Sequence, residues 1–254
     1  MEPTVAIRVA DVHKRFGPKE VLRGVDLEVR GGESVVIVGG SGAGKTVLLK
    51  HLIGLLQPDE GRVEVDGLDL ATLSRAESLE LRKRFGMAFQ EGALFDSMTV
   101  RDNIAFPIRR HRRATPAAVD DRVRECLAMV RLEEGSAVKL PAELSGGMRR
   151  RVGFARAIAL APEFLLFDEP TTGLDPINTA AIAAVINRLR SELAVTVVTI
   201  THDMNLAFRI ADRIAMLRRG RILAEAEPAA FRELDDLYVQ AFLRGEVPAD
   251  EEDA

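Results

Sequence analysis

The chain has 254 residues, 47% of them hydrophobic and 29% charged, which suits a single globular α/β domain that can bury a core. Its formal net charge of -4 argues against a nucleic-acid-binding protein. Its one cysteine, Cys126, excludes an internal disulfide, which fits a reducing cytoplasm, and is expected to be a small core residue. No uninterrupted apolar run approaches the roughly 18 residues of a membrane-spanning helix, so any work at a membrane would need spanning helices from another chain.

The N-terminal part predicts two strands of an antiparallel layer. Residues 5–12 and 21–29 have strand-like patterns, and Gly17-Pro18 supplies turn chemistry between them. Phe16, directly before the turn, either stacks on a purine ring or is an ordinary rim or core aromatic.

The most specific motif of the chain stands between a β-branched strand at 34–38 and a helix-like run at 47–53. It reads Gly39-Gly40-Ser41-Gly42-Ala43-Gly44-Lys45-Thr46 and fits the P-loop pattern G-x-x-x-x-G-K-[ST]. Its glycines let the backbone curl, so that successive N–H groups point at one phosphate chain near the positive end of the helix. Lys45 is predicted to bridge the β- and γ-phosphates, and Thr46 to ligate Mg²⁺.

A helical insertion is predicted after two further strands. Residues 62–67 and 85–89 read as strands, and Gln90 closes the second. The pattern then changes to helices at 100–108, 116–130 and 145–160. This indicates a helical lobe over 91–161, inserted into a sheet-rich core of 1–90 and 162–225. Residues 226–254 are predicted to form C-terminal helices and an acidic tail. The basic runs 109–113 and 149–151 are interpreted as solvated helix faces.

The loop that follows Gln90 is unusually apolar. It contains Ala93, Leu94, Phe95 and Met98 where polar residues are more common. Either these side chains fold under the helical lobe, or they line a docking groove for another protein.

Two acids follow the apolar strand at 164–167. Carboxylates at the carboxyl end of a buried parallel strand face the crevice in which α/β sheets bind ligands. Asp168 is predicted to hold Mg²⁺, commonly through water, and Glu169 to be the base that orients or deprotonates an attacking water. The alternative, two acids that cap the next turn, is disfavoured by the P-loop upstream.

A second β-branched strand, at 195–201, brings His202 to the same edge, where it can reach a γ-phosphate. A closing hairpin around Gly220 is predicted from residues 214–217 and 221–224. The other histidines show no ligand spacing and suggest no metal site beyond nucleotide-bound Mg²⁺.

Leu144-Ser145-Gly146-Gly147-Met148 is a motif that ordinary P-loop proteins lack. Physically, Ser145 can cap the helix that follows, and Asp175 can cap the helix that starts at Pro176. Together with the P-loop, Gln90, the strand-end acids, Gly173-Leu174-Asp175 and His202, the motif resembles the ATP-binding cassette (ABC) ATPases over nearly the whole chain.

The resemblance implies a P-loop NTPase of the ABC type, with a parallel-sheet core, an antiparallel β layer and an inserted helical lobe, that hydrolyses ATP with Mg²⁺. It implies that Gln90 senses Mg²⁺ and the γ-phosphate. It also implies a head-to-tail homodimer, in which Ser145, Gly146 and Gly147 close over ATP held by the other subunit's P-loop and Asp175 communicates across the interface.

The sequence departs from the family pattern at two positions. Met148 stands where the signature usually ends in Gln, and Val47 where a second hydroxyl usually follows the P-loop. Val47 loses a side-chain contact to the α-phosphate but keeps its backbone N–H. Neither change touches the chemical groups, so an active enzyme is expected.

The run 89–100, the LSGGM variant and Asp102-Asn103-Ile104-Ala105-Phe106-Pro107 resemble the ATPases of MCE-associated lipid transporters, including the bacterial Mla system. That resemblance implies a peripheral subunit at the cytoplasmic face of the inner membrane, paired with an integral permease and an MCE-domain protein and often with a small STAS-domain subunit. The rival is a polar amino-acid importer, whose ATPases usually carry a different loop after the glutamine. A non-transport ABC protein of translation or DNA repair is disfavoured by the single cassette and the acidic balance.

Overall fold

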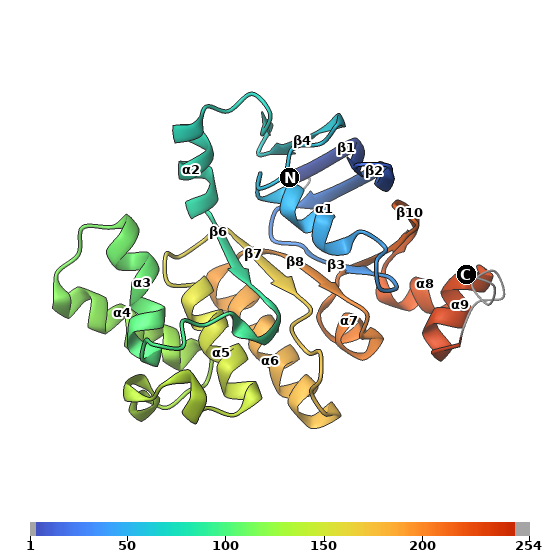
Figure 1. Ribbon diagram of the computed structural model, residues 1–254. Coiled ribbons are helices and arrows are strands. Elements are labelled where there is room, and N and C mark those ends of the chain that lie inside the picture. Colours follow the sequence, from blue (N-terminus) through green and yellow to red (C-terminus); the bar gives the residue numbers. More distant parts are fainter. Residues whose placement is uncertain (1–3, 247–254) are drawn as a thin grey trace.

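The computed structural model describes residues 4–246, and the predicted acidic tail therefore lies largely outside the described residues. Two sheets and a set of helices make up the fold (Figure 1). The larger sheet has the strand order β10-β9-β3-β8-β7-β6, in which every neighbouring pair is parallel except β10 with β9. Its strands are β3 Ser34–Val38, β6 Phe85–Ala88, β7 Phe164–Asp168, β8 Thr196–Thr201, β9 Arg213–Arg218 and β10 Arg221–Ala226.

The smaller sheet is antiparallel and has the order β2-β1-β4-β5. Its strands are β1 Val5–Phe16, β2 Lys19–Arg30, β4 Glu60–Val65 and β5 Leu68–Asp69. Helix α1, Lys45–Leu52, lies between the two sheets (Figure 1), and its buried leucines join one core with side chains from both. This confirms the expected antiparallel layer over a parallel core.

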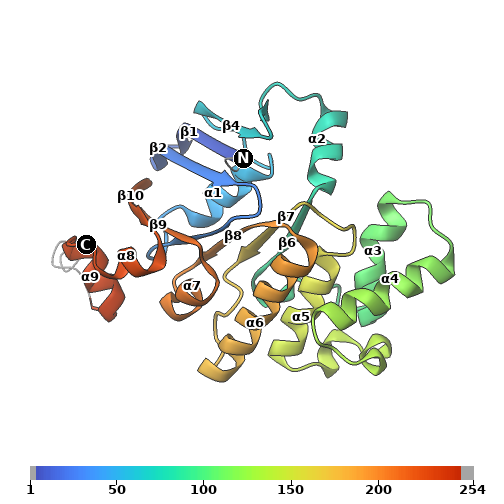
Figure 2. The ribbon, with the colours of Figure 1, turned by 180° about the vertical axis from the view of Figure 1, so that it is seen from behind.

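The opposite face of the larger sheet is covered by helices (Figures 1 and 2). These are α5 Gly146–Ala157, α6 Pro176–Leu193 and α7 Met204–Ile210, while α3 Val100–His111 and α4 Pro116–Met129 pack on α5 and α8 Pro228–Arg232 and α9 Leu237–Arg244 lie beside the β9–β10 hairpin. Strand β3 alternates between the layers: Val36 and Val38 pack in the helical core, while Val35 and Ile37 pack in the core around α1. A strand buried on both faces reads as a continuous apolar run for this reason.

Side-chain caps fix the starts of several helices that follow loops. Thr99 and Thr115 accept hydrogen bonds from Asp102 N and Ala118 N at the starts of α3 and α4. Helix α2, Arg75–Lys83, was not predicted, although Ser74 and Glu77 form a reciprocal capping box there. Helix α7 and the short strand β5 were also missed.

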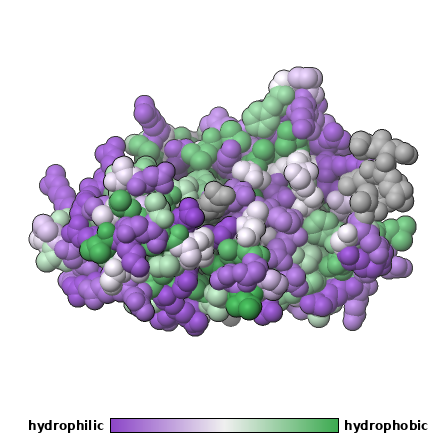
Figure 3. All heavy atoms as spheres, turned by 60° about the horizontal axis from the view of Figure 1, so that its bottom comes forward, coloured by the Kyte–Doolittle hydropathy of each residue, from purple (hydrophilic) through white to green (hydrophobic). Residues whose placement is uncertain are grey.

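Within the described part of the chain, no helix is both long and apolar enough to span a bilayer. The face turned forward in Figure 3 is largely hydrophilic, with apolar residues scattered over it. Cys126 is buried, as expected of a small core residue, and burial raises the pKa of its thiol to about 11.

Candidate functional site

The P-loop connects the buried end of β3 to α1, and close packing requires glycine at two of its positions, Gly39 and Gly44. A methyl group added at Gly39 would lie 2.2 Å from the carbonyl oxygen of Leu217 in β9. Gly44 has φ +107, and a methyl group there would lie 2.9 Å from Leu22 Cδ2. Any side chain at either position would therefore force the loop away from β9 or β2. Gly40 is less confined, since its added methyl would meet Tyr238 Oη at an ordinary 3.6 Å.

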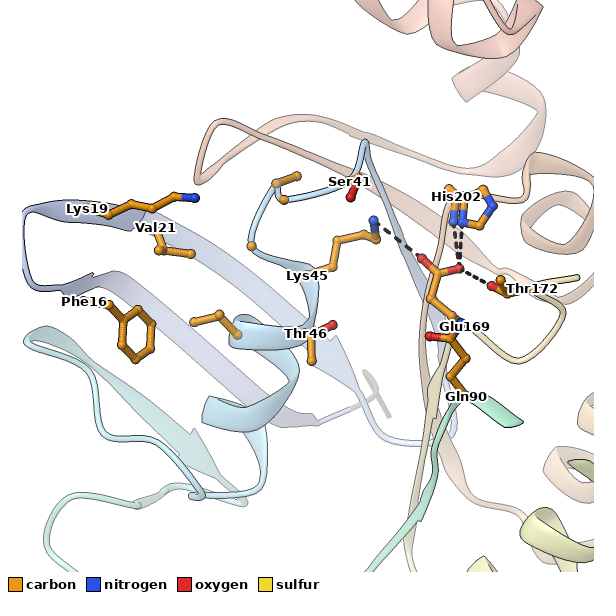
Figure 4. A pocket seen from close by; sticks show the side chains of 14 residues that line it. Phe16, Lys19, Val21, Ser41, Lys45, Thr46, Gln90, Glu169, Thr172 and His202 are labelled. Carbon is orange, nitrogen blue, oxygen red and sulfur yellow. Dashed lines mark hydrogen bonds and ion pairs between the residues drawn. The ribbon is translucent and has the colours of Figure 1, made fainter. Parts of the chain in front are cut away.

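The P-loop forms the floor of an open cleft of about 760 Å³. Figure 4 shows Phe16, Lys19 and Val21 on one side of this cleft and Gln90, Glu169 and His202 on the other. The residues that line it are Phe16, Lys19, Val21, Ser41, Gly42, Ala43, Gly44, Lys45, Thr46, Val47, Gln90, Glu169, Thr172 and His202. The structure thus brings together segments that lie up to 186 positions apart, from Phe16 to His202.

Lys45 is buried on the floor of the cleft, with 8% of its surface exposed. Its Nζ donates hydrogen bonds to the carbonyl oxygens of Gly39, at 2.8 Å, and Gly40, at 3.0 Å. It also lies 3.6 Å from Glu169 Oε1 (Figure 4). The lysine charge is thus held between the phosphate-loop backbone and the strand-end acid.

Glu169 is the centre of a hydrogen-bond cluster at the carboxyl ends of β7 and β8. Its Oε2 is 2.8 Å from His202 Nδ1 and accepts from Thr172 Oγ1 at 3.2 Å (Figure 4) and from Thr201 Oγ1 at 3.4 Å. Its backbone has φ +49, the left-handed region that a non-glycine residue rarely adopts, and its N–H donates to Ile200 O at 2.9 Å. Backbone and side chain together fix the carboxylate at the edge of the cleft.

Asp168 precedes Glu169 but is not among the residues that line the cleft. Burial raises the pKa of its carboxyl, and the neighbouring Glu169 charge adds to the effect, while Lys45 and Lys50 oppose it. A cation beside this carboxyl would favour its charged form.

The polar groups of the cleft fit Mg²⁺ and a nucleotide. Thr46 and Gln90 both line the cleft and carry hydroxyl and amide oxygens, and such hard oxygen donors suit Mg²⁺; Gln90 lies beside Glu169 (Figure 4). Residues 4–246 contain no group of three or more His, Cys, Asp or Glu side chains able to hold a metal by themselves. For the nucleotide, the cleft offers the amides of the P-loop, Lys45 and the exposed ring of Phe16.

The signature and the later Asp175 lie outside this cleft. Ser145 caps α5 by accepting from Met148 N at 3.3 Å, and Asp175 caps α6 by accepting from Ile177 N and Asn178 N, each at 2.9 Å. Hydrogen bonds from Asn178 lower the pKa of the Asp175 carboxyl. Ser145 and Asp175 are exposed, as are Gly146 and the neighbouring Ile177. Both caps were predicted, and the structure confirms them.

Sequence reasoning missed three residues that line the cleft: Lys19, Val21 and Thr172. Lys19 and Val21 follow the predicted turn after Phe16, so their nearness to the P-loop depends on how the two sheets pack. Thr172 stands three residues after Glu169 in the same turn, and that spacing was a usable signal.

The apolar loop after Gln90 has one side chain packed against the helical core and another exposed beside a groove, and docking of another protein there stays a prediction. Leu94 is half-buried against the helical core, whereas Phe95 is 41% exposed. Phe95 packs on Phe106 with ring centroids 4.9 Å apart, beside a groove of about 360 Å³. Leu94 therefore does not contribute to an exposed apolar surface in the way that Phe95 does.

Comparisons with known proteins agree with this geometry. The family model described as "ABC transporter" matches residues 22–172. The probable ribonucleotide transport ATP-binding protein mkl of Mycobacterium leprae is 41% identical over 241 residues, which are 95% of this chain and 69% of that protein. The intermembrane phospholipid transport system ATP-binding protein MlaF of Haemophilus influenzae is 40% identical over 240 residues, 94% of this chain and 90% of that protein.

Among solved structures, a dimeric ATP-binding cassette in a post-hydrolysis state, bound to ADP and Pi, superposes with a TM-score of 0.80. It is 33% identical in sequence, and the match covers 87% of this chain and 98% of that one.

Proposed function

The chain belongs to the ABC transporter family, and from that premise we propose that it hydrolyses ATP to power a membrane transporter whose cargo is phospholipid or another lipid. The observation that carries the ATPase assignment is the position of Glu169. Its carboxylate lies 3.6 Å from the P-loop lysine and 2.8 Å from His202, at the edge of the cleft. A carboxylate held by several donors beside a phosphate-binding loop can orient and deprotonate an attacking water.

The site residues predicted from the sequence have distinct roles in this proposed reaction. The P-loop amides and the N-terminus of α1 bind the phosphate chain, and Lys45 compensates negative charge on the β- and γ-phosphates. His202 holds the carboxylate of Glu169, and the second role we propose for it is contact with the γ-phosphate. When bound, Mg²⁺ neutralises charge that develops on phosphate oxygens, and Thr46, Gln90 and Asp168 would supply its protein oxygens. Phe16 lines the other side of the cleft, and we propose that its ring stacks on the purine.

We further propose that the active form is a homodimer with two shared sites. Ser145, Gly146, Gly147 and Asp175 are polar or small, lie outside the cleft of their own chain, and include exposed positions at the starts of α5 and α6. A second copy placed head to tail would bring them to the first copy's P-loop. The similar cassette bound to ADP and Pi is dimeric, which supports this arrangement.

Lipid is favoured as the cargo by the relative named for intermembrane phospholipid transport, which the match covers almost entirely. The same similarity disfavours a polar amino-acid importer. The mycobacterial relative is named for ribonucleotide transport, and ribonucleotide is therefore the competing cargo. We propose an integral permease and an MCE-domain protein as partners, with a STAS-domain subunit as a further candidate, at the cytoplasmic face of the inner membrane.

The cargo proposal is tested by purifying the complex from native membranes and identifying its proteins and small molecules by mass spectrometry. We expect a permease, an MCE-domain protein and phospholipid beyond the amount carried by a control membrane protein. A complex that holds nucleoside monophosphates or amino acids and no excess lipid would contradict the lipid assignment and leave the ATPase assignment standing.

A further inference from the structure

Arg150 is a buried cation between the signature segment and the turn that follows Glu169. Only 7% of its surface is exposed, although it stands in a basic run whose first member, Arg149, is exposed. The expectation that residues 149–151 form a solvated helix face is wrong at this position. Burial of a guanidinium is unfavourable unless its N–H groups find acceptors, so its surroundings must supply specific ones.

One acceptor leads to the proposed catalytic base. Arg150 Nη2 donates to the backbone carbonyl oxygen of Thr172. The hydroxyl of the same Thr172 donates to Glu169 Oε2 at 3.2 Å. A single residue thus separates the arginine on α5 from the carboxylate at the end of β7.

The other end of the guanidinium lies at the start of the signature helix. A methyl group added at Gly146 would lie 3.6 Å from Arg150 Nη1. Gly146 stands four residues, about one helical turn, before Arg150, and side chains on a helix lean toward its N-terminus. The guanidinium therefore packs under the segment that begins at Ser145.

We propose that Arg150 is a positioning residue that links the signature segment to Glu169 through Thr172. This inference rests on the proposed role of Glu169 as the base. A shift of the signature segment changes where Arg150 holds the carbonyl of Thr172, and hence where the threonine hydroxyl holds the carboxylate. In a dimer with shared sites, the signature serves one site and Glu169 the other, so this link connects the two sites within one chain.

The test compares two arginines on the same helix. Arg151 also donates to backbone carbonyls, to that of Arg131 at 3.0 Å and to that of Gly147 at 3.4 Å, but neither acceptor lies in the turn that follows Glu169. Arg150→Met is expected to lower kcat for ATP about tenfold, with KM and the Kd of a fluorescent ADP within about twofold of wild type. Arg151→Met should leave all three within about twofold, and Arg150→Lys should recover part of kcat because it keeps a donor.

A double-mutant cycle with Thr172→Val separates positioning from simple stabilisation. If Arg150 acts through Thr172, the double variant that carries both Arg150→Met and Thr172→Val should lose no more kcat than the more severe of the two single variants. If Arg150→Met does not fold, Arg150→Lys takes its place in the cycle. Losses that multiply, an equal kcat loss in Arg151→Met, or a change in KM alone would each overturn the proposal. Wild-type protein that hydrolyses no ATP would instead overturn the proposed function.

Discussion

Phe95 is expected to anchor a short helix of the permease in the groove beside β6, and its replacement by aspartate should release that partner. The side chain is 41% exposed and packs on Phe106, while the Arg156 guanidinium lies 5.7 Å from its ring. A phenylalanine of roughly 200 Å² that is 41% exposed leaves about 80 Å² to be covered, worth about 2 kcal/mol at 25 cal/mol per Å². That corresponds to a loss of about thirtyfold in affinity, and the aspartate charge adds to it.

Two matched variants distinguish docking from folding. Leu94→Asp places a charge against the helical core and should lower the melting temperature of the isolated subunit, because Leu94 is half-buried there. Leu79→Asp on α2 also introduces a charge at an exposed apolar position, which is 48% exposed, but it lies outside the groove and should affect neither property. The assay is co-purification of the permease beside a thermal melt. If Phe95→Asp keeps the permease and loses stability, the docking idea is refuted.

Three further outcomes follow from the site and the core. Lys45→Ala should weaken nucleotide binding itself, measured by titration with fluorescent ADP, because it removes the cation that lies over the P-loop carbonyls. When Lys45→Ala subunits are mixed with Ser145→Arg subunits, part of the ATPase activity should return, because a heterodimer confines both substitutions to one shared site and leaves the other site intact. No recovery over the separate variants would contradict shared sites. Burial lowers the pKa of His51 below its ordinary 6.5, so the unfolded chain binds the proton more readily than the folded chain. The free energy of unfolding should therefore fall as the pH drops below 6.5, by at most about 1.4 kcal/mol per pH unit. In urea titrations at several pH values, His51→Leu should flatten this slope, and an unchanged slope would show that His51 is not responsible.

The strands and the strand-end chemistry were predictable because each depends on local pattern. Apolar runs at 34–38, 164–167 and 195–201 became β3, β7 and β8, and parallel neighbours necessarily bring their carboxyl ends together. Glu169 and His202 therefore meet, as the sequence suggested, at 2.8 Å.

The contacts that were missed depend on how separate elements pack. Arg150 looks like any solvated arginine in a basic run, and only the approach of α5 to the turn at Thr172 buries it. Leu94 and Phe95 are adjacent apolar residues, yet Leu94 packs against the core and Phe95 lines the groove. They follow Ala93, whose backbone is left-handed with φ +45. No periodicity reports such a difference in a loop.

The role of Glu169 is the central claim, and phosphate release by Glu169→Gln measures it most directly. Glutamine keeps the size and a hydrogen-bonding oxygen but cannot accept the proton, so turnover should fall by about 10²–10⁴, the usual range for a positioned base. Binding of fluorescent ADP should stay close to wild type, because the P-loop is untouched. Near-normal phosphate release by Glu169→Gln, with Lys45→Ala inactive in the same assay, would contradict the assignment of Glu169 as the base.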